Sequence, residues 1–237
     1  LTGGGTAANM ESLWTARNCK YYLVSIAITL SELNSESMWQ QICTAVRNIN
    51  LGDKRFNDFL PEELFGLAPS YTLNFDTELT KLLQKFAHEQ KSSGIADMAL
   101  FLEEIKKRSI RYLGVSGIHN RFEQCFNKKL DMPLLILPQS RHYSWEKAAD
   151  VLGIGSANIR YVKVDNEFRI DLEHFDEVLL NKKSGSQPNI LMAVGVIGTT
   201  EEGVLDPIHG MLKIKDNLQS TGSGFWFHLD AAYGGYY

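Results

Sequence analysis

Short apolar runs alternate with amphipathic stretches throughout the C-terminal half of the chain. The apolar runs predict strands at 133–137, 159–164, 190–197 and 225–229. Apolar positions at helical spacing predict helices between them, at 144–152, 171–180 and 207–219. Strands that alternate with helices of about ten residues favour a largely parallel sheet covered on both faces. This half of the chain is therefore predicted to be an α/β domain.

The N-terminal half has a different pattern. Residues 1–18 run from a glycine turn into a helical pattern, in which Thr6 is the expected N-cap. Residues 24–130 hold many charges and show no alternation of strands and helices. Helices are predicted there at 36–49, 77–90 and 96–108. We interpret 24–130 as a mainly helical insertion in an α/β domain that begins at 1–23 and continues at 131–237.

Composition narrows the class of protein. The chain has 237 residues, of which 44% are hydrophobic and 22% charged, as is usual for a globular protein with a substantial core. A net charge of −4 gives no electrostatic reason to expect nucleic acid or an anionic membrane as partner. No apolar stretch approaches the roughly 18 residues that span a bilayer. The start at Leu1 shows no signal-peptide pattern.

Cysteine usage gives a prediction about the compartment. Cys19, Cys43 and Cys125 are widely spaced, odd in number and without a CxxC pair. This arrangement argues against a disulfide framework and against a zinc site, so no metal is expected. Free thiols are typical of a reducing cytoplasm.

Two candidate sites lie in turns beside predicted elements. Gly3, Gly4, Gly5 and Thr6 form a glycine-rich turn before a helix, where free backbone N–H groups and the helix dipole favour an anion. A purely structural turn is an equally good interpretation of these residues alone. The turn matches neither GxGxxG nor a P-loop, which disfavours nucleotide binding by those routes.

His142 follows one predicted strand and precedes a helix, so it is expected at the carboxyl edge of the sheet. On its own, a histidine in this place is more often a structural hydrogen-bonding residue, and we interpret His228 in the same way. The loop GTTEEGVLDP at 198–207 contains Thr200 and Asp206, and taken alone it is a polar connection into a helix that starts at Pro207.

Asp230 is the most informative acid of the chain. It follows the apolar run Phe225, Trp226 and Phe227, at the strand end where α/β folds bind ligands. A buried carboxylate is costly unless it has a partner, so its position indicates a bound cation or donor. The small residues that follow, AAYGG, leave open space beside it.

Four stretches together resemble one family. They are GGGTAANMESLWTAR, HYSWEKAADVLGIG, GTTEEGVLDP and HLDAAYGGYY, which cover 1–18 and parts of 132–237. They resemble the group II pyridoxal-phosphate (PLP)-dependent amino-acid decarboxylases, nearest to the bacterial and archaeal tyrosine decarboxylase branch, which also carries a long insertion after its phosphate-binding helix. The resemblance implies the large domain of a fold type I, PLP-dependent transferase-like enzyme, and a homodimer.

The resemblance also implies roles for particular residues. Gly4, Gly5 and Thr6 would hold the PLP phosphate, with Gly3 where the family often has serine. His142 would stack on the pyridine ring opposite Ala232. Thr200 and Asp206 would line the cofactor site, and Asp230 would pair with the ring nitrogen. His142 and Asp230 are thus the expected catalytic residues.

The family's Schiff-base lysine is expected beyond Tyr237, in a part of the protein that this chain does not include. The four lysines that could be considered instead lack the family's sequence context; they are Lys182, Lys183, Lys213 and Lys215. This chain is therefore interpreted as a fragment that would not turn over alone.

The expected reaction is decarboxylation of an L-amino acid, preferably tyrosine or a related aromatic one, to an amine and CO₂. Two alternatives remain from the sequence. One keeps the cofactor but changes the chemistry, to glutamate decarboxylation or to a lyase or transaminase reaction, and product analysis would separate these. The other is a non-catalytic dimer scaffold, which absence of the lysine from the full-length protein would favour.

Overall fold

A computed structural model describes residues 2–89, 92–180, 189–220 and 224–236. The chain divides into two compact units. The α/β unit consists of Leu1–Arg17 and Asp131–Tyr237, and the helical unit is Asn18–Leu130. The first boundary lies within helix α1 (Gly5–Glu32). The sequence had suggested a domain boundary after residue 23, but α1 continues through that position without a break.

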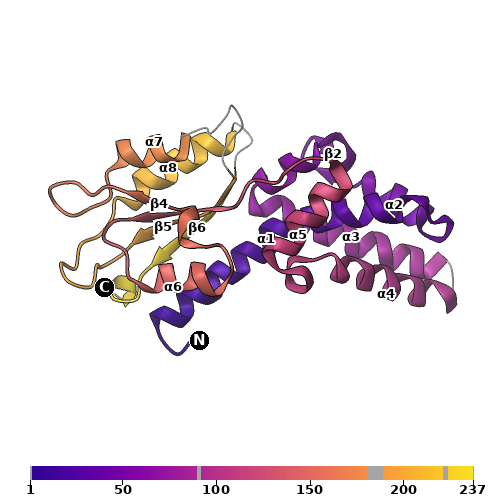
Figure 1. The fold of residues 1–237 in the computed structure, drawn as a ribbon, viewed down its shortest axis with the longest axis horizontal. Coiled ribbons are helices and arrows are strands. Elements are labelled where there is room, and N and C mark those ends of the chain that lie inside the picture. Colours follow the sequence, from indigo (N-terminus) through magenta and orange to yellow (C-terminus); the bar gives the residue numbers. More distant parts are fainter. Residues whose placement is uncertain (1, 90–91, 181–188, 221–223, 237) are drawn as a thin grey trace. The chain divides into compact units, whose positions relative to one another are not determined.

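The α/β unit is built on a four-stranded parallel sheet (Figure 1). Its strands are β3 (Leu134–Pro138), β4 (Ile159–Val162), β5 (Ile190–Val196) and β6 (Trp226–Asp230), in the order β4-β3-β5-β6. The predicted α/β class with a parallel sheet is confirmed. The strand predicted at 159–164 ends two residues early, because Val164 forms only an isolated antiparallel bridge with Ile170.

Helices cover both faces of this sheet (Figure 1). On one face, α7 (Leu172–Leu180) and α8 (Ile208–Ser220) contribute Phe175 and Met211 to a core with strand residues such as Ala193. On the other lie α6 (Ser144–Val151) and the first turns of α1. Asp171 caps α7, since its side chain accepts hydrogen bonds from the backbone N–H groups of residues 173 and 174.

The start of α1 differs from the prediction in one respect. Thr6 is not the N-cap, because the helix already begins at Gly5. The N–H of Ala8 donates to the carbonyl of Gly4 at 3.0 Å, so Gly4 is the residue that precedes the helix. Gly4 has a φ of +143°, which a residue with a side chain rarely adopts. The glycine turn therefore sets the helix start, and Thr6 lies in the first turn.

The helical unit contains short elements and three longer helices. In chain order after α1 they are η1 (Leu33–Ser35), η2 (Ser37–Trp39), α2 (Gln40–Arg47), β1 (Asn50–Leu51), β2 (Lys54–Arg55), η3 (Phe56–Asp58), η4 (Pro61–Gly66), α3 (Pro69–Glu89), α4 (Ser92–Lys107) and α5 (Ile110–Phe126). The predicted helices correspond to α2, α3 and α4, but α5 and the β1–β2 hairpin were missed. Gly114 interrupts α5 with non-helical backbone angles, so the helical spacing of apolar residues does not continue through α5.

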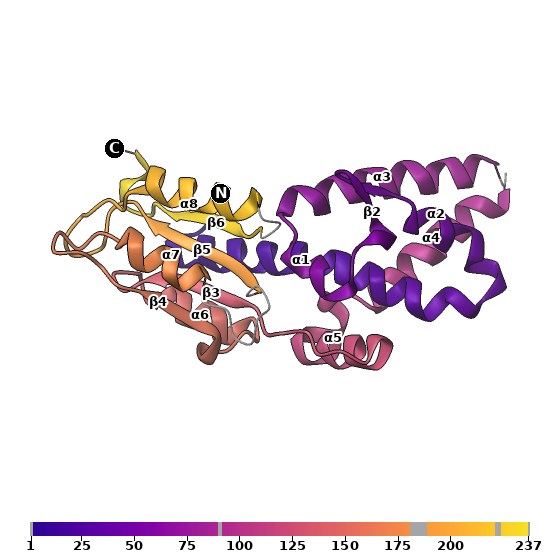
Figure 2. The ribbon, with the colours of Figure 1, turned by 90° about the horizontal axis from the view of Figure 1, so that it is seen from above.

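The second half of α1 is the centre of the helical unit (Figure 2). Nearly every residue from Lys20 to Leu30 is buried. The hydroxyl of Tyr22 donates to Asp76 of α3 at 2.7 Å, and that of Tyr21 lies 2.7 Å from His119 of α5.

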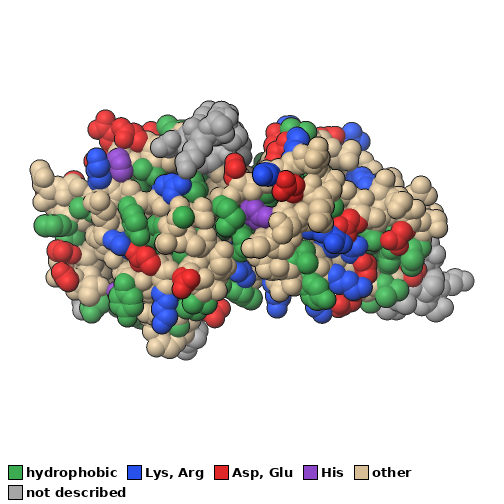
Figure 3. All heavy atoms as spheres, in the orientation of Figure 1, with side chains coloured by type: hydrophobic (Ala, Val, Ile, Leu, Met, Phe, Trp, Pro, Cys, Tyr) green, Lys and Arg blue, Asp and Glu red, His purple; other side chains and the backbone are tan. Residues whose placement is uncertain are grey.

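On the face in Figure 3, acidic and basic side chains are interspersed rather than gathered into one patch. Among the described residues, no helix is both long and apolar enough to span a membrane.

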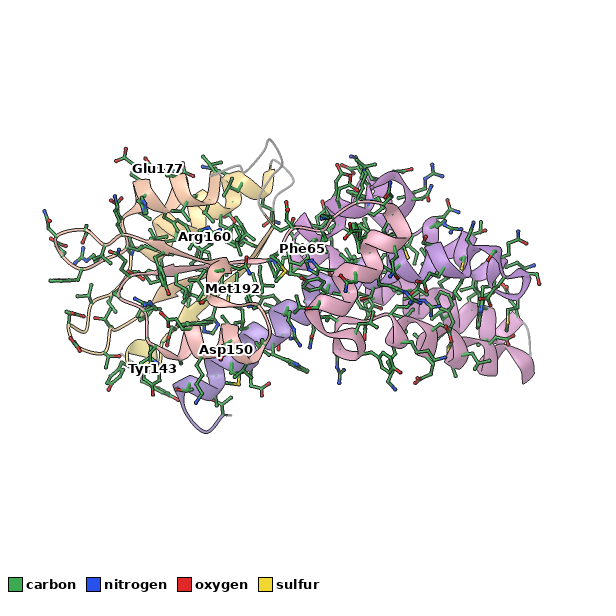
Figure 4. The ribbon with its side chains drawn as sticks, in the orientation of Figure 1. Phe65, Tyr143, Asp150, Arg160, Glu177 and Met192 are labelled. Carbon is green, nitrogen blue, oxygen red and sulfur yellow. The ribbon has the colours of Figure 1, made fainter. Side chains whose placement is uncertain are left out.

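Lys20 is a buried cation in this apolar core. Its side chain is only 2% exposed, and Nζ donates to the carbonyl of Leu67 at 2.9 Å. Nζ also lies 5.1 Å from the centre of the Phe65 ring, which is labelled in Figure 4. Burial lowers the pKa of Lys20 to about 7, because the charged ammonium loses its hydration.

This shift predicts a pH dependence of stability. Between about 7 and the ordinary lysine value of 10.5, the unfolded chain binds a proton that the folded chain does not. The free energy of unfolding should therefore rise with pH across this window, by at most ~1.4 kcal/mol per unit of pH. The Lys20→Met variant lacks this pH-dependent contribution to the free energy of unfolding. The stability of the variant relative to the native protein should therefore be greatest near pH 7 and fall toward pH 10. Denaturant unfolding at several pH values measures this difference.

Lys81→Met is the matched control. Lys81 is 66% exposed in its side chain and, among the described residues, pairs with Glu78 on the same helix. Its substitution should leave a small and nearly constant difference from pH 7 to pH 10. A constant difference for Lys20→Met as well would contradict the lowered pKa of Lys20.

Candidate functional site

A pocket of about 280 Å³ opens at the carboxyl edge of the sheet. The segments that line it are the start of α1, the loop between β3 and α6, the end of β5 with the loop after it, and the end of β6 with the residues after it. The lining residues are Gly5, Thr6, Asn9, Ser140, His142, Val196, Gly198, Thr199, Thr200, Asp230, Ala232 and Tyr233. Crevices at this edge are where parallel α/β sheets bind ligands.

Most of the residues singled out in the sequence meet in this pocket. They are Gly5, Thr6, His142, Thr200, Asp230 and Ala232. Gly4 adjoins the pocket through its neighbour Gly5 but is not a lining residue. Asp206 is also absent from the lining.

Asp206 is instead used to hold the backbone together. Its Oδ1 accepts the N–H of Ile170 at 2.8 Å, and its Oδ2 accepts the N–H of Val196 at 2.7 Å. Burial raises the pKa of Asp206, and these two hydrogen bonds act in the opposite direction. The carboxylate thereby joins the end of β5 to the segment before α7.

Asp230 is held through one oxygen only. Oδ2 accepts hydrogen bonds from Asn9 Nδ2 at 2.8 Å and from Trp145 Nε1 at 3.1 Å. Asp230 is 6% exposed, and Trp145 is fully buried. Within the described part of the chain, no donor reaches Oδ1. A buried carboxylate in the pocket wall thus keeps one oxygen for a bound donor or cation.

His142 is fixed by the first residue of α6. Its Nδ1 lies 2.9 Å from Ser144 Oγ, and the backbone N–H of Ser144 donates to the same nitrogen at 3.2 Å. Its ring centre lies 4.2 Å from that of Tyr143, which is labelled in Figure 4 and is largely exposed. The loop therefore presents an imidazole of set orientation to the pocket.

Gly5 and Ala232 bring the start of α1 against the segment after β6. A Cβ atom added at Gly5 would lie 2.8 Å from Cβ of Ala232, closer than two carbon atoms can approach. The first-turn N–H groups of α1 have no acceptor within the helix, and the positive end of the helix dipole lies there. Absence of a side chain at Gly5 leaves these groups accessible to an anion.

Several site residues were missed from the sequence: Asn9, Ser140, Ser144, Trp145 and Thr199. Asn9 had a signal that could have been used. It precedes Leu13 and Ala16 at helical spacing, and those two are fully buried, so a polar side chain there had to find partners inside the protein. Thr199 shapes the loop, since its hydroxyl accepts the N–H of Val204 at 3.1 Å.

No lysine lines the pocket among the described residues. Lys213 and Lys215 lie on α8, where Lys215 Nζ is 3.2 Å from Gln219 Oε1. Lys182 and Lys183 lie outside the described residues.

Residues 90–237 match the family described as the pyridoxal-dependent decarboxylase conserved domain. The chain belongs to this family. The predicted resemblance to the group II PLP-dependent decarboxylases is thereby confirmed, and it also covers part of the helical unit, where no motif had been recognised.

Curated relatives extend the match over the whole chain. The L-tyrosine decarboxylase of Levilactobacillus brevis is 31% identical over 238 residues, and that of Enterococcus faecalis is 31% identical over 237 residues. Each alignment covers 100% of this chain but 29% of the relative, so the chain spans less than a third of their length. An aspartate 1-decarboxylase of Aliivibrio fischeri is 38% identical over 102 residues, which are 43% of this chain and 17% of that protein.

Solved structures give partial matches. The crystal structure of mouse CSAD in apo form is 26% identical, covers 53% of this chain and 24% of its own, and has a TM-score of 0.42. A glutamate decarboxylase domain from Vibrio parahaemolyticus is 26% identical, with coverage of 44% and 21% and a TM-score of 0.39.

The residues of the pocket fit PLP. The α1 terminus suits a phosphate, and the free oxygen of Asp230 suits a protonated ring nitrogen. The imidazole of His142 and the small Ala232 are suited to the two faces of a flat ring. Ser140 Oγ is buried without a hydrogen-bond partner among the described residues, as expected of an atom that a polar ligand satisfies.

Gly5→Ala should disturb the pocket more than the fold. The added methyl group must displace Ala232, whereas helix propensity favours alanine over glycine by up to ~1 kcal/mol. We expect at least a tenfold weaker affinity for PLP in the full-length protein, by absorbance titration, with a nearly unchanged melting temperature. Gly3→Ala is the control, because no atom lies within 4 Å of its added Cβ. Equal PLP affinity in the two variants would show that the Gly5–Ala232 contact does not shape the pocket.

Proposed function

We propose that the protein to which this chain belongs is a PLP-dependent decarboxylase of an L-amino acid, with tyrosine or a related aromatic amino acid as substrate. The products would be the amine and CO₂. The observation that carries the proposal is Asp230, whose carboxylate lies in the pocket wall and is fixed by two donors on one oxygen. Family membership supports the same cofactor.

The residues of the chain would share the work of holding and orienting the cofactor. N–H groups of Gly5, Thr6 and their neighbours in the first turn of α1 would bind its phosphate. The charge of Asp230 would favour a protonated ring nitrogen, because an ion pair is strong in a site that excludes water. When bound, PLP supplies an electron sink for the cleavage of a bond at the amino-acid α-carbon.

His142 and Ala232 would confine the ring from its two faces. Ring stacking contributes roughly 0.5–1.5 kcal/mol beyond the burial of area. Its larger effect is on orientation, since a fixed reactive geometry can supply about 7–11 kcal/mol of a reaction barrier. Thr200 lines the same pocket and could contact the cofactor or the substrate. Asp206 would act indirectly, by holding the end of β5.

The choice of tyrosine is supported by relatives named L-tyrosine decarboxylase that align with the whole chain. Aspartate is a second candidate, because the aspartate 1-decarboxylase relative shows higher identity over a shorter region. A homodimer and a cytoplasmic location complete the proposal. The location is supported by the cysteines, since Cys19, Cys43 and Cys125 are all free thiols.

The direct test is product analysis with the full-length protein and added PLP. L-tyrosine, L-aspartate and L-glutamate are supplied separately, and the amine, CO₂ and keto acid are measured. We expect tyramine and equimolar CO₂ from tyrosine, at a kcat/KM at least tenfold above those of the other two substrates. Formation of a keto acid without CO₂ would contradict decarboxylation and indicate transaminase chemistry. No product and no PLP band in the absorbance spectrum would favour a non-catalytic scaffold.

Asp230→Ala in the full-length protein should lower kcat by at least a thousandfold, because the ring nitrogen loses its anionic partner. Asp216→Ala is the control, since Asp216 is an exposed acid on α8 whose neighbour Lys215 lies 3.7 Å away. Its activity should be close to that of the native protein. Near-native turnover by Asp230→Ala would remove Asp230 from the catalytic residues.

A further inference from the structure

Hydrogen-bonded side chains connect the pocket to the interior of the α/β unit. Ser12 Oγ lies 2.8 Å from His228 Nδ1, and His228 Nε2 lies 3.3 Å from Asn9 Oδ1. Asn9 Nδ2 then reaches Ser144 Oγ at 3.1 Å, and Ser144 Oγ reaches His142 Nδ1 at 2.9 Å. We call these side chains, from Ser12 to His142, the Asn9 chain. Asn9 and Ser144 are 3% and 1% exposed, so the bond between them is shielded from water.

Asp230 sets the direction of the Asn9 chain. The indole N–H of Trp145 can only donate, so Oδ2 is an acceptor and the Asn9 atom at 2.8 Å from it is the amide nitrogen. The amide oxygen of Asn9 therefore faces His228. The orientation of this amide follows from chemistry, whichever way it is drawn.

The orientation of Asn9 fixes the proton on His228. An amide oxygen accepts, so His228 Nε2 must carry a hydrogen to bond with it. Burial lowers the pKa of His228 and so favours the neutral ring, while the charge of Asp230 acts in the opposite direction. In the neutral ring Nδ1 is then an acceptor, and the hydroxyl of Ser12 donates to it.

The two hydrogen bonds from Ser144 determine the tautomer of His142, and the orientation of Asn9 is consistent with both. The second amide hydrogen of Asn9 points to Ser144 Oγ, which leaves the hydroxyl hydrogen of Ser144 free to donate to His142 Nδ1. The backbone N–H of Ser144 also reaches this nitrogen, and a backbone N–H can only donate. Nδ1 is thus an acceptor, and in the neutral ring the hydrogen lies on Nε2.

We propose that Asn9 is a positioning residue that anchors the Asp230 carboxylate and orients the Ser144 hydroxyl toward His142. The pocket then presents a fixed carboxylate at Asp230 and an N–H donor at His142 Nε2 to an acceptor atom of a bound molecule. The part that concerns cofactor binding rests on the proposed function. The part that concerns the His142 tautomer depends only on the hydrogen bonds of the α/β unit.

The first measurement is the tautomer of His142 in the full-length protein without cofactor or substrate. Long-range ¹H–¹⁵N spectra of the ¹⁵N-histidine-labelled protein distinguish protonated from unprotonated ring nitrogens. The His142→Gln variant identifies the signals by their loss. We expect a hydrogen on Nε2 and a hydrogen-bonded, unprotonated Nδ1. A ring with its hydrogen on Nδ1 would overturn the proposal, whether or not the protein proves to be a decarboxylase.

The second measurement separates hydrogen bonding from packing. Asn9→Asp keeps the shape of the side chain but replaces the donor to Asp230 with an acceptor. We expect its affinity for PLP to fall at least tenfold. Thr29→Ala is the matched control, because Thr29 is a buried polar residue on the same helix whose hydroxyl donates to the carbonyl of Ser25, within α1 itself. It should keep native PLP affinity even if its melting temperature falls.

Native PLP affinity in Asn9→Asp would limit Asn9 to packing and overturn its positioning role. If Asn9→Asp does not fold, Asn9→Ser is measured in its place, since serine is small and can still donate one hydrogen bond. Its affinity should lie between those of the native protein and Asn9→Ala. Equal affinities of Asn9→Ser and Asn9→Ala would contradict the proposal.

Discussion

The site depends on how a buried carboxylate is accommodated at the end of β6. An isolated carboxylate in a protein interior is strongly unfavourable, so Asp230 requires hydrogen-bond donors within the folded protein. Asn9 supplies one from α1 and Trp145 supplies another from α6. Since both donors reach the same oxygen, the carboxylate is anchored without being fully satisfied. The same two bonds hold α1 and α6 against the end of the sheet, so this charge organises the structure as well as the proposed chemistry.

Small residues determine how closely the segments around this acid approach one another. The contact between Gly5 and Ala232 leaves no room for a methyl group, and it places the positive end of α1 beside the residues that follow β6. The helix start, which suits an anion, and the carboxylate therefore lie in the wall of one pocket although they have opposite electrostatic preferences. A ligand with a phosphate at one end and a cationic nitrogen at the other matches both. PLP has this distribution of charge.

The sequence was sufficient for the sheet because apolar runs such as 190–197 have few alternatives to a buried strand. Helix boundaries were less predictable where glycine interrupts the pattern, as Gly114 does in α5. The individual motifs indicated most of the pocket, because loops after parallel strands meet at one edge. The hydrogen bonds of the Asn9 chain could not be predicted from motifs at strand ends. Its contacts join residues 135 and 221 positions apart, from Asn9 to Ser144 and to Asp230, and a single sequence contains no record of such pairs.

Asp206 and Asp230 show why a motif does not by itself assign a role. Both are buried acids near the carboxyl edge of the same sheet, and both lie in stretches that resemble the family. Asp206 uses both oxygens on backbone N–H groups and does not line the pocket, so its carboxylate holds β5 rather than meeting a ligand. Asp230 uses one oxygen on side chains and keeps the other in the pocket wall. The distinction between an acid that supports the fold and one suited to chemistry therefore lies in whether its carboxylate lines the pocket, and that is known only after the surrounding segments are placed.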